Sequence, residues 1–253
     1  MQQIPLTEFD DDKMGIIEPA VLFENISPPE YCVMPIYSSV IDKLNKDGRL
    51  EKIYESQTPL AQMGVYKMEY EGKFITVAHP GLGAPFAAAT LEELIALGCR
   101  KFVACGSAGV LKSDLNRGAI VIPSSAVRDE GTSYHYYPPS REIEIDQKII
   151  KKLESVLRKH QIDYEIGKTW TTDAFYRETR GKIKRRKAEG CLTVDMECSA
   201  FIAVSKFRNV IFGQYLAVGD DVSGDEWDPR LSNNRQAIRE KVFWLSVEAC
   251  LSL

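Results

Sequence analysis

A series of mostly apolar segments, each followed by glycine, hydroxyl or acidic residues, most strongly constrains what this chain can fold into. These segments are too short for buried helices and have the length of buried strands, and they cover residues 74–78, 101–105, 119–122, 164–169 and 210–218. Several alternate with helical patterns that end near residues 97, 157 and 188. Strands that are apolar on both faces indicate a sheet covered on both sides. We therefore predict a single α/β domain with a central mixed β-sheet flanked by helices on both faces.

The first thirty residues differ from the rest of the chain. Residues 1–30 are acidic, contain proline and show weak periodicity, which predicts an N-terminal arm ahead of one domain at 31–253. At the start of that domain we expect a short strand at 31–35 and a short helix at 39–44. The pair 65–70 and 74–79, separated by Glu71-Gly72, reads as a β-hairpin.

Composition and spacing exclude several classes of protein. The net charge of −4 comes from intermixed acids and bases, without the basic patch that binds nucleic acid. No signal peptide begins the sequence and no apolar stretch could span a membrane, so we expect a cytoplasmic protein without membrane contacts. The six cysteines form no CxxC pair and the three histidines lack ligand spacing, which predicts free thiols, no metal site and no cofactor.

Residues suited to ligand binding follow three of the predicted strands. Ligands of such sheets bind beyond the carboxyl ends of the strands. Gly81-Leu82-Gly83 precedes a helix, so the N–H group of Gly83 is a candidate anion contact, although turn geometry explains the glycines equally well. Gly106-Ser107-Ala108-Gly109 directly follows a buried strand and is either a ligand loop or a tight turn. The convergence of these loops indicates an enzyme that acts on a small molecule.

Asp220 also follows an apolar strand and adjoins a second acid. Burial and the neighbouring charge would favour the protonated form of one carboxyl group, as a general acid needs. An N-cap or Asx turn before Ser223-Gly224 is the alternative. We interpret the basic run from Lys182 to Lys187 as a solvated helix face, and the acids around Trp227 as a solvated loop.

The segment Val194-Asp195-Met196-Glu197-Cys198-Ser199-Ala200 places two carboxylates at the start of a predicted buried helix. Apolar residues recur at helical spacing from Met196 to Phe207. Glu197 lies near the helix N-terminus, where a carboxylate is favoured, and could accept hydrogen bonds from a polyol. Helix-start acids flanking a core methionine are the simpler interpretation.

With these motifs the chain resembles the nucleoside phosphorylase and nucleosidase superfamily, from about residue 74 to residue 225. Residues 194–200 are similar to the family's V-E-M-E-x-S/A-A segment. The other matching motifs occur in the family's order: Gly106-Ser107-Ala108-Gly109, Asp129-Glu130-Gly131-Thr132-Ser133, Thr172-Asp173-Ala174-Phe175-Tyr176 and Val218-Gly219-Asp220. The resemblance implies a nucleoside phosphorylase-like fold and catalytic domain, cleavage of an N-glycosidic bond, and a homo-oligomer (dimer, trimer or hexamer).

The resemblance also implies roles for individual residues. Glu197 would hold the ribose hydroxyls, with Met196 and Ser107 beside the sugar. The base would contact Phe175, Ala108, Gly109 and Asp195. Asp220 matches the acid that purine-cleaving members use to protonate the leaving base, whereas residues 131–135 and 172–176 look more like uridine phosphorylase segments. The implied substrate is a nucleoside or nucleotide, with a purine favoured.

The phosphate-binding arginines of the family are missing. Residues 35–40 lack the glycine and arginine of the family's P-G-D-x-x-R segment, and Ala104 stands where another arginine is found. The arginine lent by a neighbouring subunit would fall near Gln57. Phosphate is held mainly by bidentate arginine contacts. We therefore expect water as the nucleophile, in a nucleosidase.

Two alternatives remain open. A true phosphorylase, of purine or uridine type, could use phosphate through a rebuilt anion site that contains Arg177, Arg180 or basic residues of another subunit. A non-catalytic nucleoside-binding protein could keep the sugar and base pockets without turnover.

Overall fold

The computed structural model describes residues 4–22, 26–57, 62–231 and 234–253. Ten strands of this part form one mixed sheet. In chain order their bounds are β1 Tyr31–Pro35, β2 Glu51–Gln57, β3 Gln62–Tyr70, β4 Lys73–Ala78, β5 Lys101–Val110, β6 Ile120–Asp129, β7 Glu142–Glu144, β8 Tyr164–Thr172, β9 Cys191–Asp195 and β10 Ile211–Asp221. The predicted α/β domain with a central mixed sheet is confirmed.

Half of the sheet closes on itself. The strand order β10-β6-β8-β9-β5 is completed by parallel pairing of β5 with β10, so these five strands form a ring. The other half, β1-β4-β3-β2, extends from β5 as an open sheet. Because β5 belongs to both halves, the residues near its carboxyl end lie at the centre of the molecule.

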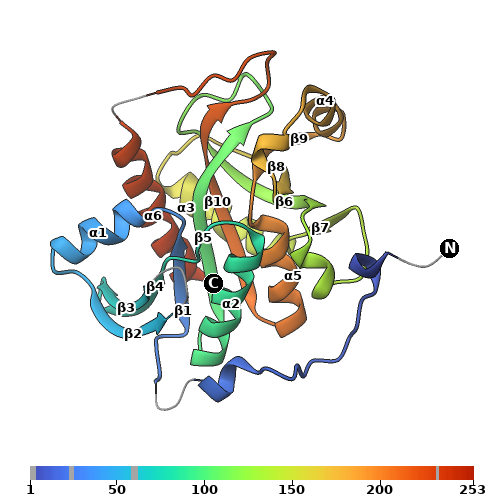
Figure 1. Ribbon diagram of the computed structural model, residues 1–253. Helices are drawn as coiled ribbons and strands as arrows, with labels where there is room; N and C mark the ends of the chain where they lie inside the picture. Colours follow the sequence, from blue (N-terminus) through green and yellow to red (C-terminus); the bar gives the residue numbers. More distant parts are fainter. Residues whose placement is uncertain (1–3, 23–25, 58–61, 232–233) are drawn as a thin grey trace.

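Six α-helices of the described chain cover the sheet, with bounds α1 Ser38–Lys46, α2 Ala84–Leu97, α3 Gln147–Lys159, α4 Arg180–Ala188, α5 Cys198–Arg208 and α6 Arg235–Ser252. Helices α2 and α5 pack together on one face, and α1, α3 and α6 cover the other (Figure 1). Adjacent residues of β10 show the two faces. Phe212 packs against Phe201 of α5, whereas a side chain at Gly213 would meet Leu153 of α3. Helices therefore flank both faces, as predicted.

Local sequence signals explain several element ends. The hairpin of β3 and β4 turns at Glu71 and Gly72, which both adopt positive φ, as a two-residue turn of type I′ requires. Helix α2 has Pro85 in its first turn and ends at Gly98, whose φ of 120° favours glycine. The strand predicted at 31–35 is β1, and the helix predicted at 39–44 lies within α1.

The strands reach further than the sequence indicates. Residues 106–109, expected to form a loop, continue β5, because β10 and β9 both pair with them in the closed ring. Strands β6 and β8 are extended in the same way. The last helix, α6, and the strands β2, β7 and β9 were not predicted.

The described part of the N-terminal arm lies across the outside of the domain (Figure 1). It contains two short 3₁₀ helices, at Pro5–Thr7 and Pro19–Leu22. Arg208 of α5 donates to the carbonyl oxygen of Lys13, whose ammonium group lies 3.5 Å from the ring centre of Phe207. No helix of the described ranges has both the length and the apolar character needed to cross a membrane.

Candidate active site

A cavity of about 690 Å³ opens where β1, β5, β9 and β10 end. This volume lies within the usual range for small-molecule sites, about 300–1,000 Å³. Residues from eight separate stretches of chain line it: Ile36, Tyr37, Leu82, Ser107, Gly109, Phe175, Tyr176, Glu178, Val194, Asp195, Met196, Glu197, Asp220, Val222, Trp227 and Arg239. The cavity therefore brings together both predicted catalytic residues, Glu197 and Asp220.

Glu197 occupies the position before α5 and is only 4% exposed. The predicted helix start is two residues early, because α5 begins at Cys198. The side chain of Glu197 does not cap its own helix; its Oε1 accepts a 2.7 Å hydrogen bond from the N–H group of Gly83, which precedes α2. Burial, together with the charge of Asp195, raises the pKa of Glu197 to about 8. Glu197 is therefore mainly protonated at neutral pH, and its other oxygen can serve a ligand.

Asp195 holds the backbone around Glu197 in place. Its Oδ2 accepts from the N–H groups of Glu197 and Cys198, and its Oδ1 accepts from the hydroxyl groups of Thr169 and Thr171. Burial raises the pKa of this carboxyl group, although the four hydrogen bonds oppose the shift. Asp195 lines the cavity, and its two engaged oxygens hold the backbone that carries Glu197; its predicted contact with a base stays a prediction.

Asp220 lies near the end of β10 and lines the same cavity. Its Oδ2 accepts a 2.6 Å hydrogen bond from Nε1 of Trp227. The neighbouring acid, Asp221, is instead paired with Arg230, and hydrogen bonds from Ser223 and Arg230 lower its pKa even though burial opposes this. The two adjacent acids therefore have different surroundings, and Asp220 is the one that faces the cavity.

Successive residues of β5 point to opposite faces of the sheet, so the four residues Gly106-Ser107-Ala108-Gly109 do not all face the cavity. Ser107 and Gly109 face the cavity, whereas Ala108 is buried on the other face against Val110 and Val218. Ala108 therefore does not line the cavity, so the structure gives no support to its predicted contact with the base. At Gly109 a Cβ atom would lie 2.9 Å from Val194 and 3.8 Å from Oδ1 of Asp220, so the absence of a side chain there lets these elements approach.

Aromatic and apolar side chains form the rim of the cavity. Phe175 is 46% exposed, and its ring centre lies 4.1 Å from that of Tyr176. Met196 lines the same cavity, as expected for a sugar contact. An exposed pair of rings beside a cavity can stack on a flat ligand.

Glu178 is a cavity residue that the sequence does not single out. It lies just before α4, and burial, followed by the charge of Asp220, raises its pKa to about 7. The pocket therefore contains a second carboxyl group that is partly protonated at neutral pH. The sequence does not reveal Glu178 as a cavity residue, because Glu178 and Asp220 are far apart in the chain and come close only in the fold.

The candidate anion contacts do not line the cavity. Arg180 donates to the carbonyl oxygen of Asp225, and it lines a separate surface hollow with Lys184 and Lys187. Arg177 is exposed and does not line the cavity, and the N–H group of Gly83 is used by Glu197. The arginine that does line it is Arg239 of α6, which the sequence analysis did not predict.

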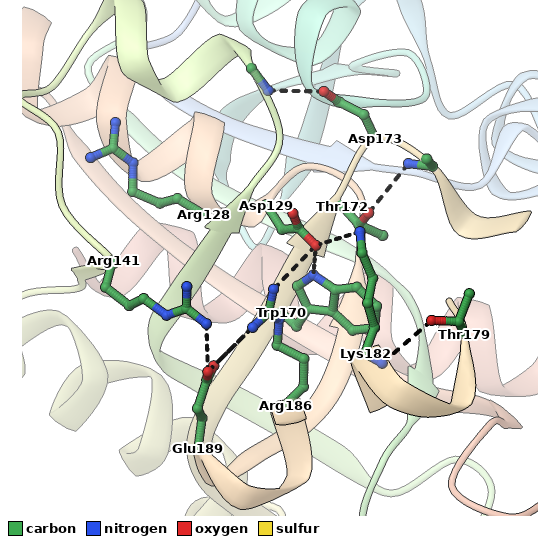
Figure 2. A network of polar contacts seen from close by, with 12 residues as sticks. Arg128, Asp129, Arg141, Trp170, Thr172, Asp173, Thr179, Lys182, Arg186 and Glu189 are labelled. Carbon is green, nitrogen blue, oxygen red and sulfur yellow. Dashed lines mark hydrogen bonds and ion pairs between the residues drawn. The ribbon is translucent and has the colours of Figure 1, made fainter. Parts of the chain in front are cut away.

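Part of the basic run on α4 is structural rather than solvated. In Figure 2, Lys182 and Arg186 point toward Asp129 at the end of β6, and Asp129 also accepts from the indole of Trp170. Arg186 is buried and pairs with Glu189 as well, whereas Lys184 and Arg185 are exposed. This network fixes α4 on the sheet and so fixes Glu178, which precedes the helix.

The remaining motif residues support the cavity from behind. Glu130 accepts from the hydroxyl group of Ser199 and from the N–H group of Ser133, which ties the 129–133 segment to α5. All six cysteines are free and buried, as predicted. In the described ranges no group of three or more metal-ligating side chains comes together.

Comparisons with known proteins agree with this architecture. A family model described as "Phosphorylase superfamily" matches residues 40–249. A guanosine phosphorylase of Halorubrum lacusprofundi is 25% identical over 213 residues, which cover 83% of this chain and 86% of that protein. A uridine phosphorylase of Thermococcus kodakarensis is 37% identical over 112 residues, covering 43% and 39% respectively. The crystal structure of uridine phosphorylase from Vibrio fischeri ES114 has a TM-score of 0.76 at 22% identity, covering 90% of this chain and 94% of that one, so the two share a fold.

Proposed function

The chain belongs to the phosphorylase superfamily, and on this premise we propose that it cleaves the N-glycosidic bond of a nucleoside and releases the free base. The observation that carries the proposal is the shared cavity of Glu197 and Asp220, two acids that lie on different elements and face the same space. The names of the similar proteins, guanosine and uridine phosphorylase, support the same reaction class.

In the proposed mechanism Asp220 acts at the base and Glu197 at the sugar. Asp220 donates a proton to the departing base, a contribution of about 10²–10⁴-fold for general acid catalysis. Glu197 hydrogen-bonds the ribose through the oxygen that Gly83 does not use. As positive charge develops on the sugar, the ionised form of Glu197 becomes favoured and stabilises it electrostatically. Met196 and Ser107 border the sugar, and Phe175 and Gly109 border the base.

A purine is the favoured base. Support comes from the position of Asp220, because a proton donor at the base side suits a leaving group that accepts a proton on a ring nitrogen. Glu178, with its pKa raised to about 7, supplies a second proton-bearing group on the same side. The half-exposed ring of Phe175 offers a stacking surface for a flat heterocycle.

Water is the first candidate for the nucleophile, because residues 35–40 and Ala104 lack the arginines expected of a phosphate site. Phosphorolysis is the second candidate, and Arg239 is the specific observation in its favour. This arginine comes from α6 but its guanidinium lies 5.1 Å from the ring centre of Tyr37, within the segment that lacks the family arginine. Arg177 and Arg180 do not line the cavity and give no support to either alternative.

A panel of purine and pyrimidine nucleosides, assayed for base release with and without phosphate, tests the proposal. Hydrolysis predicts base release in phosphate-free buffer, and phosphorolysis predicts release only with phosphate together with formation of a sugar 1-phosphate. Tight nucleoside binding without release of base under either condition would indicate a binding protein and contradict the proposal. The Asp220→Asn variant serves as the negative control for chemistry.

A further inference from the structure

A second cavity adjoins the first on the side of α6. Its volume is about 430 Å³, and Ser107, Asp220, Trp227 and Arg239 line both cavities. Because these residues are shared, the two cavities lie next to each other, with Ser107 and Asp220 between them. The second cavity differs from the first in its charge.

Three arginines line this second cavity: Arg117, Arg235 and Arg239. They come from the loop before β6 and from the first two turns of α6, so they are brought together only by the fold. Within the described ranges, the one acidic side chain lining the cavity is Asp220, whose Oδ2 is engaged by Trp227. Three cations facing one space repel one another, and an anion placed between them would relieve that repulsion.

Arg117 and Arg239 use only part of their hydrogen-bonding capacity within the described part of the chain. Arg117 donates to the carbonyl oxygen of Pro229, and Arg239 donates to the hydroxyl group of Ser39 at 3.2 Å, but neither forms an ion pair with a described carboxylate. The Nε atoms of Arg117 and Arg239 are buried without a partner among the described residues, although a guanidinium offers five N–H donors.

Tyr37 adds an independent sign of a missing ligand. Its side chain is only 4% exposed, and among the described residues its buried hydroxyl group has only the hydroxyl group of Ser107 beside it. The ring lies beside Arg239 and lines the first cavity. An unsatisfied buried hydroxyl costs free energy unless a ligand or water completes its hydrogen bonds.

We propose that Arg117 and Arg239, with Arg235 at the outer edge, bind a phosphate group next to the sugar pocket. A phosphate offers oxygens in several directions and a charge near −2, which suits several arginines better than a single carboxylate would. The site takes its cations from α6 and the β5–β6 connection, and not from residues 35–40 and 104, where the arginines of the family are missing.

The phosphate has two chemical sources. It is either inorganic phosphate, which attacks the sugar, or the phosphate of a nucleotide substrate, which anchors that substrate. In the first case a phosphate oxygen bonds to the anomeric carbon, the N-glycosidic bond breaks, and the base leaves with the proton from Asp220. In the second case the phosphate takes no part in bond cleavage. The choice between these sources rests on the proposed function, whereas binding of phosphate to the arginines does not.

Calorimetric titration with inorganic phosphate at constant ionic strength tests the binding site without any turnover. We expect wild type to bind, and Arg239→Gln and Arg117→Gln to weaken binding about 10- to 100-fold each, the loss expected for a hydrogen-bonded charge contact. Arg185→Gln, which removes an exposed arginine of α4, is the matched control and should bind as wild type does. Arg239→Lys keeps the positive charge but cannot make the two parallel hydrogen bonds of a guanidinium. It should therefore lose less phosphate affinity than Arg239→Gln and keep the thermal stability of wild type.

Kinetics then separate the two sources. An inorganic nucleophile predicts phosphate-dependent base release and formation of a sugar 1-phosphate, which the two glutamine variants slow. A nucleotide anchor predicts a KM for nucleoside monophosphates that these variants raise about tenfold or more, with the KM for nucleosides unchanged. The proposal is overturned if wild type does not bind phosphate at millimolar concentrations. It is also overturned if Arg117→Gln and Arg239→Gln bind phosphate as tightly as the control Arg185→Gln. A protein that binds phosphate but releases no base from any substrate would refute the proposed function alone.

Discussion

At one end of the cavity Glu197 is 4% exposed, whereas at the other Asp220 is partly exposed and Trp227, which donates to it, is 66% exposed. Glu197 is fixed by the N-terminus of α2 through Gly83 and by Asp195, which binds the backbone on both sides of the helix start. Asp220 depends on one indole from the loop that follows β10. The end that we propose for the sugar is therefore built into the core, and the end that we propose for the base is more exposed.

This difference matches the demands of the two halves of a nucleoside. The ribose is common to all nucleosides, so a rigid, buried set of contacts serves every substrate. The base varies and must leave after the bond breaks, which suits an open end lined by Phe175, Tyr176 and Trp227. We expect substitutions at the sugar end to affect stability as well as rate, and substitutions at the base end to affect mainly rate.

Asp220→Asn should have the largest effect. The variant cannot donate a proton to the base, so we expect kcat for base release to fall by about 10²–10⁴-fold, the usual contribution of a general acid. The melting temperature should change little, because Asp220 is at the open end. Asp225→Asn, an exposed acid of the same loop, is the matched control and should keep wild-type activity. Equal activity of both variants would remove Asp220 from the chemistry.

Glu197→Gln should change the pH dependence of stability at the buried end. The pKa of Glu197 rises on folding from 4.5 to about 8, so the folded protein binds this proton more tightly than the unfolded chain does. The stabilisation that the bound proton gives wild type is complete below about pH 4.5 and is lost as the pH rises to about 8. Each tenfold difference in proton affinity between the folded and unfolded chain corresponds to at most about 1.4 kcal/mol. Glutamine carries no such proton, so the variant should gain stability relative to wild type by a few kcal/mol between about pH 5 and pH 9.

Denaturant unfolding at several pH values measures this effect. Glu69→Gln, which changes an exposed glutamate of β3, should show no such gain relative to wild type. If the difference in unfolding free energy between Glu197→Gln and wild type stayed constant with pH, Glu197 would already be ionised in the folded protein. The distinction between the two ends would then be lost.

Trp227→Phe should have a moderate effect that is confined to the base end. Phenylalanine keeps an aromatic side chain in the loop but cannot donate to Oδ2 of Asp220. Loss of the hydrogen bond that orients the acid corresponds to a fall in kcat of about tenfold. The KM and the melting temperature should stay near their wild-type values, because the indole is mostly exposed. A raised KM with unchanged kcat would mean that Trp227 contacts the substrate instead of positioning the acid.

The two ends also differ in how well the sequence predicts them. The Glu197 end depends on one continuous segment, residues 194–200, so the local pattern and the family resemblance point to Glu197 and Met196. Gly83 was predicted as an anion contact, but its N–H group donates to Glu197. At the Asp220 end, Asp220 was predicted from a strand end and Phe175 from the family resemblance. Glu178, Trp227 and Arg239 were not, because each reaches the cavity from an element whose position depends on contacts far away in the sequence.

Strand closure accounts for most of the remaining differences. Residues 106–109 read as a loop because small residues have weak strand preference, yet pairing with β9 and β10 keeps them extended and turns Ala108 away from the cavity. The basic run on α4 read as a solvated face because its carboxylate partner, Asp129, lies over fifty residues earlier at the end of β6. Periodicity reports burial along one element, but it does not report which distant side chain completes an ion pair.

Glu178→Gln should have the smallest effect at neutral pH and gives the sharpest test of the base end. Burial and the charge of Asp220 raise the pKa of Glu178 to about 7, so its protonated form, which can donate to a base, is lost as the pH rises through 7. We expect wild-type kcat/KM to fall about tenfold per pH unit well above pH 7 if this proton is required. Glutamine retains a donor at every pH, so the variant should differ from wild type by only a few-fold at pH 6 and should lack this decline. By the same linkage, the stabilisation that the proton on Glu178 gives the folded protein is lost between about pH 4.5 and pH 7, a narrower range than for Glu197. A decline that persists unchanged in Glu178→Gln would assign the titrating group to another residue and leave Asp220 as the acid that acts alone at the base.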